Sequence, residues 1–192
     1  MGKLADEPLR DLLAAFASPS PAPAGGSASA LASAVGVSLL TMAATLPRTR
    51  DGSDEDRQLL TAVSLVLGDL QHRLIDAIDQ DAEAYRQVVS SRGAARQDAI
   101  AKAIDVPLEV MRLSTEALHA APVVAARCHR PASSDVRVGV GLVRAGFAGA
   151  RSSVQANLRG VGDVRYREAV EAEVDRLSNA AGVALDPPRA GS

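Results

Sequence analysis

The sequence predicts an all-α bundle of five or six helices, and three observations lead to this class. Hydrophobic residues make up 47% of the 192 residues but aromatic residues only 2%, so the core must consist of Ala, Leu and Val at close spacing. Long segments carry apolar residues at helical spacings of three, four and seven. The length fits one domain with a substantial core. We therefore expect residues 1–192 to form a single domain packed through small side chains, with a disordered tail from about residue 186.

The first two predicted helices are separated by a loop rich in proline and glycine. Residues 4–16 show a short amphipathic pattern, residues 18–26 form the loop, and residues 27–46 form a helix of small residues. This second helix is long enough to cross a bilayer. Its six Ser and Thr hydroxyls and its few large side chains favour a buried helix instead.

The third predicted helix is the longest periodic segment of the chain. It follows a polar turn over residues 47–52 and starts at Ser53, which forms a capping-box pattern with Asp56. It runs to about Ser91. Its apolar positions lie on one stripe, formed by Leu59, Val63, Leu67, Leu70, Leu74, Ile78, Tyr85 and Val88.

A turn around Gly93 leads to a fourth helical pattern over residues 96–119. Pro107 lies inside this pattern, where it removes one backbone hydrogen bond and bends the helix. Further along, Pro122 and Pro131 are expected to bracket a connection between helices.

The segment 134–161 carries two conflicting patterns. Val136, Val138 and Val140 alternate with other residues as in a strand, but a helical period extends over far more of the segment, and its length favours a helix. Glycines within it lower helix propensity, which is explained if another helix crosses at short range. A last helix is expected over residues 163–181.

The loop Pro23-Ala24-Gly25-Gly26-Ser27 precedes the small-residue helix. Two glycines let the backbone approach a ligand closely, and a serine after them can cap the helix. Free N–H groups and the helix dipole then favour an anion at this end. The alternative is a flexible linker before a core helix.

Three polar residues stand out on faces that should be apolar or at helix starts. Asp81 lies between Ile78 and Tyr85 on the stripe of the third helix, where burial would raise its pKa toward the range used in acid–base catalysis; a buried structural carboxylate is the alternative. Asn157 has the same character, with an interhelical hydrogen bond as its alternative. Asp135 lies at a predicted helix start, where capping is the alternative.

Charge and cysteine content exclude several classes of function. The net charge of −2 gives no nucleic-acid footprint. Of the 21 basic residues, all but Lys3 and Lys102 are arginine, which suits carboxylate or phosphate ligands or reflects genomic composition. Cys128 is the only cysteine, so no disulfide forms within the chain and a cytoplasmic location is expected. No signal-peptide pattern and no metal-ligand spacing is present, so we expect no metal.

Several of these segments, in this order, resemble the formiminotetrahydrofolate cyclodeaminase and methenyltetrahydrofolate cyclohydrolase family. The resemblance spans about residues 9–175 and is carried by Pro23 to Leu31, Asp81 to Tyr85, Arg96 to Leu108, Ser134 to Val136, and Asn157-Leu158 followed by Asp163. The chain departs from the family pattern at Ala24 in place of a glycine, at Cys128-His129 in place of Gly-Asn, and at a short connection over residues 91–95.

The resemblance implies an all-α, usually dimeric protein that acts on one-carbon derivatives of tetrahydrofolate without a metal or further cofactor. It implies Asp81 and Asp135 as catalytic residues. Substrate-binding roles fall to Gly25, Gly26, Ser27, Tyr85, His129 and Asn157, with Arg144 or Arg151 as candidates to meet the glutamate tail.

The leading hypothesis is a cyclohydrolase that converts 5,10-methenyl- to 10-formyltetrahydrofolate. A cyclodeaminase that releases ammonia from 5-formiminotetrahydrofolate is the first alternative. A diverged member that binds a small ligand without turnover, or serves as a scaffold, is the second. The expected partners are a folate and a second copy of the chain, with no nucleic acid and no membrane.

Overall fold

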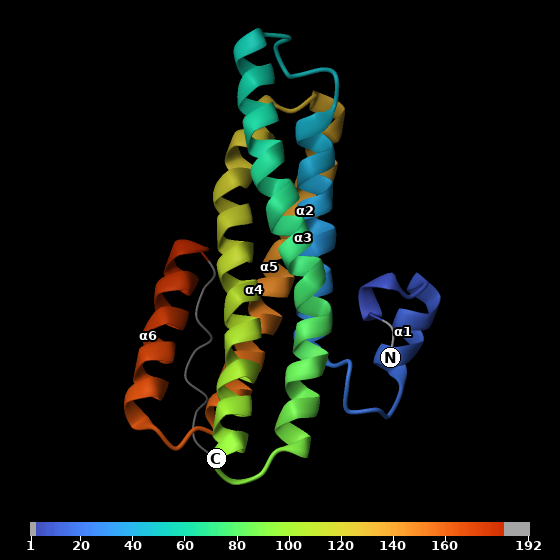
Figure 1. The fold of residues 1–192 in the computed structure, drawn as a ribbon. Helices are drawn as coiled ribbons and strands as arrows, with labels where there is room; N and C mark the ends of the chain where they lie inside the picture. The colour runs from blue at the N-terminus through green and yellow to red at the C-terminus, as the bar shows by residue number, and fades with distance from the viewer. Residues whose placement is uncertain (1–2, 183–192) are drawn as a thin grey trace, which may run out of the picture.

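The computed structural model describes residues 3–182, and over these residues it is an all-α bundle, as predicted. Four long helices run side by side and form the body of the molecule (Figure 1). They are α2 (Gly25–Thr45), α3 (Asp54–Ser90), α4 (Gly93–Arg127) and α5 (Ser133–Leu158). The predicted tail from about residue 186 lies outside the described residues.

Two shorter helices lie beside this body (Figure 1). The helix α1 (Leu9–Ala17) follows the short 3-10 helix η1 (Leu4–Asp6), which is tied to α3 where the Leu4 amide donates to Asp79 Oδ1 at 2.5 Å. The helix α6 (Val164–Ala180) packs against α4. Its N-cap is Asp163, which accepts hydrogen bonds from the Arg165 and Tyr166 amides.

The start of α3 is as the sequence predicts, but the end of α4 is not. Ser53 Oγ accepts from the Asp56 amide at 3.2 Å, so the cap is formed. The helix α4 continues past the expected end, through Pro122, to Arg127. Val124 and Cys128 extend the buried stripe at a spacing of four. Their burial outweighs the single backbone hydrogen bond that a proline removes.

The helices α2 and α5 approach closely through small residues, and the strand alternative for the segment 134–161 is wrong. A Cβ added to Gly36 would lie 2.6 Å from the Gly139 carbonyl oxygen, and one added to Gly146 would lie 2.6 Å from the Ser29 carbonyl oxygen. Such separations are too short for any side chain, so these glycines permit the crossing. The close spacing expected from the composition is therefore present in the core.

Within residues 3–182, α2 is the one helix that is long and apolar enough to cross a membrane. Half of its most apolar window is buried inside the bundle, where it packs against α3, α4 and α5. A central core helix accounts for this composition.

Candidate active site at the start of α2

The N-terminus of α2 meets the carboxylate of Asp81 on α3. The Ser27 amide donates to Asp81 Oδ2 at 2.7 Å. The Ser27 hydroxyl lies 2.9 Å from the same oxygen and 3.0 Å from the carbonyl oxygen of Ile78. The carboxylate therefore satisfies a free N–H group of the first turn of α2, where the helix dipole favours a negative charge. The predicted juxtaposition of Asp81 and the glycine loop is present in the structure.

Gly26 is required by this contact. A Cβ at this position would lie 2.5 Å from Asp81 Cγ and 2.7 Å from its Oδ2, and closer still to Oδ1. The second carboxylate oxygen, Oδ1, accepts no hydrogen bond within the described residues, whereas Oδ2 is fixed by Ser27. Oδ2 thus holds the side chain in place, while Oδ1 packs against Gly26.

Burial raises the pKa of Asp81 above its ordinary value. The two hydrogen bonds from Ser27 act in the opposite direction, because they stabilise the charged form, and burial dominates. A carboxyl group whose pKa is raised at a helix N-terminus, beside a cavity, is a candidate for acid–base chemistry.

Asp81 opens on a cavity of about 210 Å³. Its walls come from the loop before α2, the start of α2, the middle of α3, α4, and the end of α5. The lining residues are Pro21, Ala22, Ala24, Gly25, Gly26, Asp81, Tyr85, Val88, Ala103, Ser153, Ala156 and Asn157. The structure therefore brings Gly25, Gly26, Tyr85 and Asn157 to Asp81, as the sequence predicts.

Asn157 and Tyr85 lie on opposite walls. Asn157 Nδ2 donates to the Ala103 carbonyl oxygen at 2.7 Å, so the interhelical hydrogen bond considered for this residue is formed while its side chain also faces the cavity. Tyr85 is 40% exposed and forms part of the rim. Ser153 was missed by the sequence reasoning, although it lies one helical turn before Asn157 and therefore on the same face of α5.

Comparison with known proteins gives a consistent result for most of the chain. The family model described as formiminotransferase-cyclodeaminase matches residues 8–176. This chain belongs to that family. Its fold also matches the crystal structure of a formiminotetrahydrofolate cyclodeaminase from Thermotoga maritima, with a TM-score of 0.88, 21% identity, and coverage of 94% of this chain and 92% of that chain. No curated protein matches the sequence.

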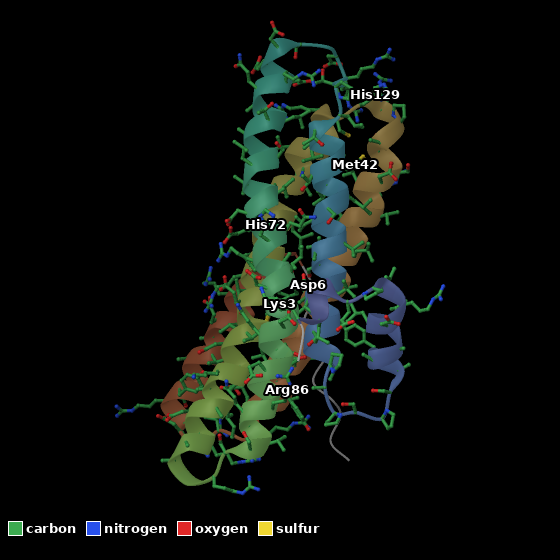
Figure 2. The ribbon with its side chains drawn as sticks, turned by 45° about the vertical axis from the view of Figure 1, so that its right-hand side comes forward. Lys3, Asp6, Met42, His72, Arg86 and His129 are labelled. Atoms are coloured by element: carbon green, nitrogen blue, oxygen red, sulfur yellow. The ribbon has the colours of Figure 1, made fainter. Side chains whose placement is uncertain are left out.

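Two residues assigned from the family resemblance lie at the other end of the bundle. His129 is at the opposite end from Arg86, which follows Tyr85 (Figure 2). Thr49 pairs with Cys128, so His129 is close to the end of α2, and Asp135 is in the first turn of α5 at this same end. The 21 residues of α2 separate the two ends by about 30 Å. Within one chain, His129 and Asp135 therefore do not join Asp81.

The arginines expected near the cleft of this family member are also placed elsewhere. Arg151 is only 3% exposed, and neither it nor Arg144 lines the Asp81 cavity. The structure instead places Arg96 beside the cavity, where its guanidinium donates to the carbonyl oxygen of Val88 at 2.8 Å. Within residues 3–182, no group of three or more metal-ligating side chains is present.

Proposed function

We propose that this chain hydrolyses 5,10-methenyltetrahydrofolate to 10-formyltetrahydrofolate. The observation that carries the proposal is the half-buried Asp81 carboxylate, which is anchored to Ser27 through Oδ2 and belongs to a residue that lines a cavity. Membership of a family of folate one-carbon enzymes supplies the substrate class. The reaction needs one group to take a proton from water and to return it to a ring nitrogen.

The proton transfers follow from the two steps of the reaction. Water attacks the bridging carbon, a C–O bond forms, and Asp81 accepts the proton that the water loses. The bond from this carbon to N5 then breaks, N5 takes the proton from Asp81, and the remaining hydroxyl proton leaves to solvent as the formyl carbonyl forms. A carboxyl group with a raised pKa suits this cycle, because it is a stronger base toward the attacking water than an ordinary carboxylate and holds the accepted proton until N5 departs as a base and takes it.

The size of the cavity indicates which part of the folate it holds. About 210 Å³ is less than the roughly 300–1,000 Å³ typical of sites that enclose a whole drug-sized ligand. We infer that the pterin head enters the cavity, near Gly25 and Asn157, while the aminobenzoyl-glutamate portion passes the exposed ring of Tyr85. Arg96 is then the candidate for contact with the glutamate carboxylates.

A second candidate reaction is the cyclisation of 5-formiminotetrahydrofolate with release of ammonia. The similarity to the Thermotoga maritima protein, which is described as a cyclodeaminase, favours it. This reaction proceeds through the same tetrahedral carbon between two nitrogens, but the group that departs is ammonia. Asp81 would then act mainly as the acid that protonates this leaving group.

One experiment separates these reactions. The purified protein is mixed with methenyltetrahydrofolate and the loss of its near-ultraviolet absorbance is compared with the uncatalysed rate, and ammonia release is measured from formiminotetrahydrofolate in parallel. Asp81→Asn should lower the activity about 100- to 10,000-fold, whereas the same substitution at Asp76, an exposed aspartate of the same helix, should not. Acceleration of ring opening supports the hydrolase, and ammonia release alone supports the deaminase.

Failure of both reactions would leave the binding hypothesis, which calorimetric titration with reduced folates tests. Binding without turnover supports a diverged ligand-binding member. A folded protein that neither turns over nor binds any reduced folate contradicts the whole proposal.

We also infer that the protein is a cytoplasmic homodimer. Exposed apolar side chains support assembly: Val35 and Met42, seven residues apart, lie on one stripe of α2, and Val138 lies on α5 beside its crossing with α2. Light scattering at micromolar concentration should give a dimer mass, and Val35→Asp should shift it toward the monomer. A monomer mass for the wild type would contradict the inference.

The lone Cys128 suits a reducing compartment, which cell fractionation tests.

A further inference from the structure

The end of the bundle opposite Asp81 contains a second cavity, of about 360 Å³, whose charged lining is entirely basic. It lies between the loop that joins α2 to α3 and the segment that joins α4 to α5. The lining residues are Pro47, Arg48, Thr49, Arg50, Gly52, Arg57, His129 and Arg130. Four arginines and a histidine thus face one hollow in a protein whose net charge is −2.

Two of these arginines are fixed in place by the ends of helices. Arg57 donates to the carbonyl oxygens of Leu46 and Pro47, and Arg50 donates to the carbonyl oxygen of Ala125 at 2.9 Å. The Leu46 and Pro47 carbonyls come directly after α2, and the Ala125 carbonyl lies in the last turn of α4, where carbonyl groups lack helical partners. Both guanidinium groups therefore use some of their N–H donors to cap these helix ends. The Nε of Arg50 is buried without a hydrogen-bond partner.

The loop that carries these residues is fixed before any ligand arrives. The Arg50 amide donates to the carbonyl oxygen of Arg127 at 2.8 Å, and Thr49 Oγ1 accepts from the Gly52 amide at 2.9 Å. Gly52 has a φ of 74°, which suits a glycine in this turn. Binding at this cavity therefore costs little ordering of the backbone.

The remaining two arginines have no structural role in the described chain. Arg48 and Arg130 are exposed, and their guanidinium groups form no hydrogen bond or ion pair within residues 3–182. No acidic side chain lines the cavity, and Asp56, in the first turn of α3, pairs with Arg127 at 3.2 Å. Asp51, Asp54 and Glu55 are exposed and do not line the cavity.

We propose that this cavity binds a small polyanion that carries at least two phosphate or carboxylate groups. Guanidinium groups bind both kinds of oxygen in bidentate geometry. The inner pair, Arg50 and Arg57, supplies fixed positive charge at the base, and Arg48 and Arg130 close on the ligand from the rim. The site lies about 30 Å from Asp81 and does not depend on the folate chemistry proposed there.

Calorimetric titration of the full chain at low ionic strength tests the site, with inorganic pyrophosphate and citrate as probes and acetate as the monovalent control. We expect saturable binding of at least one polyanion with a Kd of about 1 mM or tighter, and weak or no binding of acetate. Removal of each rim guanidinium should weaken binding about tenfold, which corresponds to about 1.4 kcal/mol, because each supplies charge-assisted hydrogen bonds to the anion. Salt should weaken binding further.

The decisive comparison uses two variants. The first is a double variant that combines Arg48→Ala and Arg130→Ala, and the second is the control Arg10→Ala, which changes an exposed arginine of α1. Loss of binding in the first variant and its retention in the second support the site, and the preferred probe tells whether it is built for phosphate or carboxylate. Circular dichroism confirms that each variant is folded. Absence of saturable binding by both polyanions, or equal weakening by Arg10→Ala, would overturn the proposal.

Discussion

Gly26→Ala is the sharpest perturbation of the proposed catalytic group, because it changes the position of Asp81 without changing its chemistry. The new Cβ would lie 2.5 Å from Asp81 Cγ, whereas carbon atoms in ordinary contact lie about 3.5–4.0 Å apart. The carboxylate must therefore move by about 1 Å, and that movement breaks its hydrogen bonds with Ser27. A misplacement of about 1 Å can lower a rate about 100-fold.

The same substitution has two opposing effects on stability. Alanine is favoured over glycine in a helix by about 1 kcal/mol at most. Loss of a hydrogen bond to a charged group costs about 1.5–3 kcal/mol. The second effect is larger, so we expect Gly26→Ala to lower the free energy of unfolding by about 1–2 kcal/mol while the chain remains folded.

The assay combines kcat/KM for methenyltetrahydrofolate hydrolysis with urea unfolding. Gly68→Ala is the matched control, since Gly68 lies within α3 and an added Cβ would meet nothing within 4 Å. It should raise stability by about 1 kcal/mol and leave kcat/KM unchanged. If Gly26→Ala stays folded and keeps the wild-type kcat/KM, the position of the Asp81 carboxylate is irrelevant to the reaction and our reasoning is refuted.

Three further predictions follow from the same geometry. Asp81→Asn should lower kcat/KM about 100- to 10,000-fold. Because burial raises the pKa of Asp81 in the folded state, the free energy of unfolding of the wild type should increase as the pH falls through this pKa toward the pKa of the unfolded state. The variant should lack this pH dependence when urea unfolding is measured over a series of acidic pH values. Ser27→Ala removes a hydroxyl that lowers this pKa, so the acid limb of the pH–rate profile should move to higher pH. Gly146→Ala should destabilise the chain by about 1–3 kcal/mol through overpacking against α2, whereas Gly141→Ala, whose Cβ meets nothing within 4 Å, should not.

The sequence predicted the parts of the site that periodicity controls. Asp81 shares a stripe with Ile78 and Tyr85, so a core-facing carboxylate followed from spacing alone, and the glycine loop next to Ser27 indicated a helix start that could receive it. Asn157 followed from the same argument on α5. Asp81, Tyr85 and Asn157 line one cavity with Gly25 and Gly26, because all of them lie near the same end of the bundle.

Periodicity along a helix does not tell at which end of a bundle a residue lies. His129 and Asp135 were grouped with Asp81 because their motifs occur in one order along the chain. The lengths of the helices decide the matter: the chain rises through α2, returns through α3, and rises again through α4 before it reaches His129. An even number of long helices would have returned it to the level of Gly25, but three leave it at the far end (Figure 2).

The small residues that let α2 and α5 cross also determine the geometry at Asp81. Gly26 and Gly36 are ten residues apart on one rigid helix, about 15 Å along its axis. Gly36 meets Gly139 at a separation that no side chain permits, and Gly146 meets Ser29 in the same way. Two such contacts fix α2 against sliding along α5. The helix that carries Gly26 and Ser27 is therefore held in register on its α5 side by backbone contacts, and on its α3 side by the hydrogen bonds of Ser27 to Asp81 and Ile78.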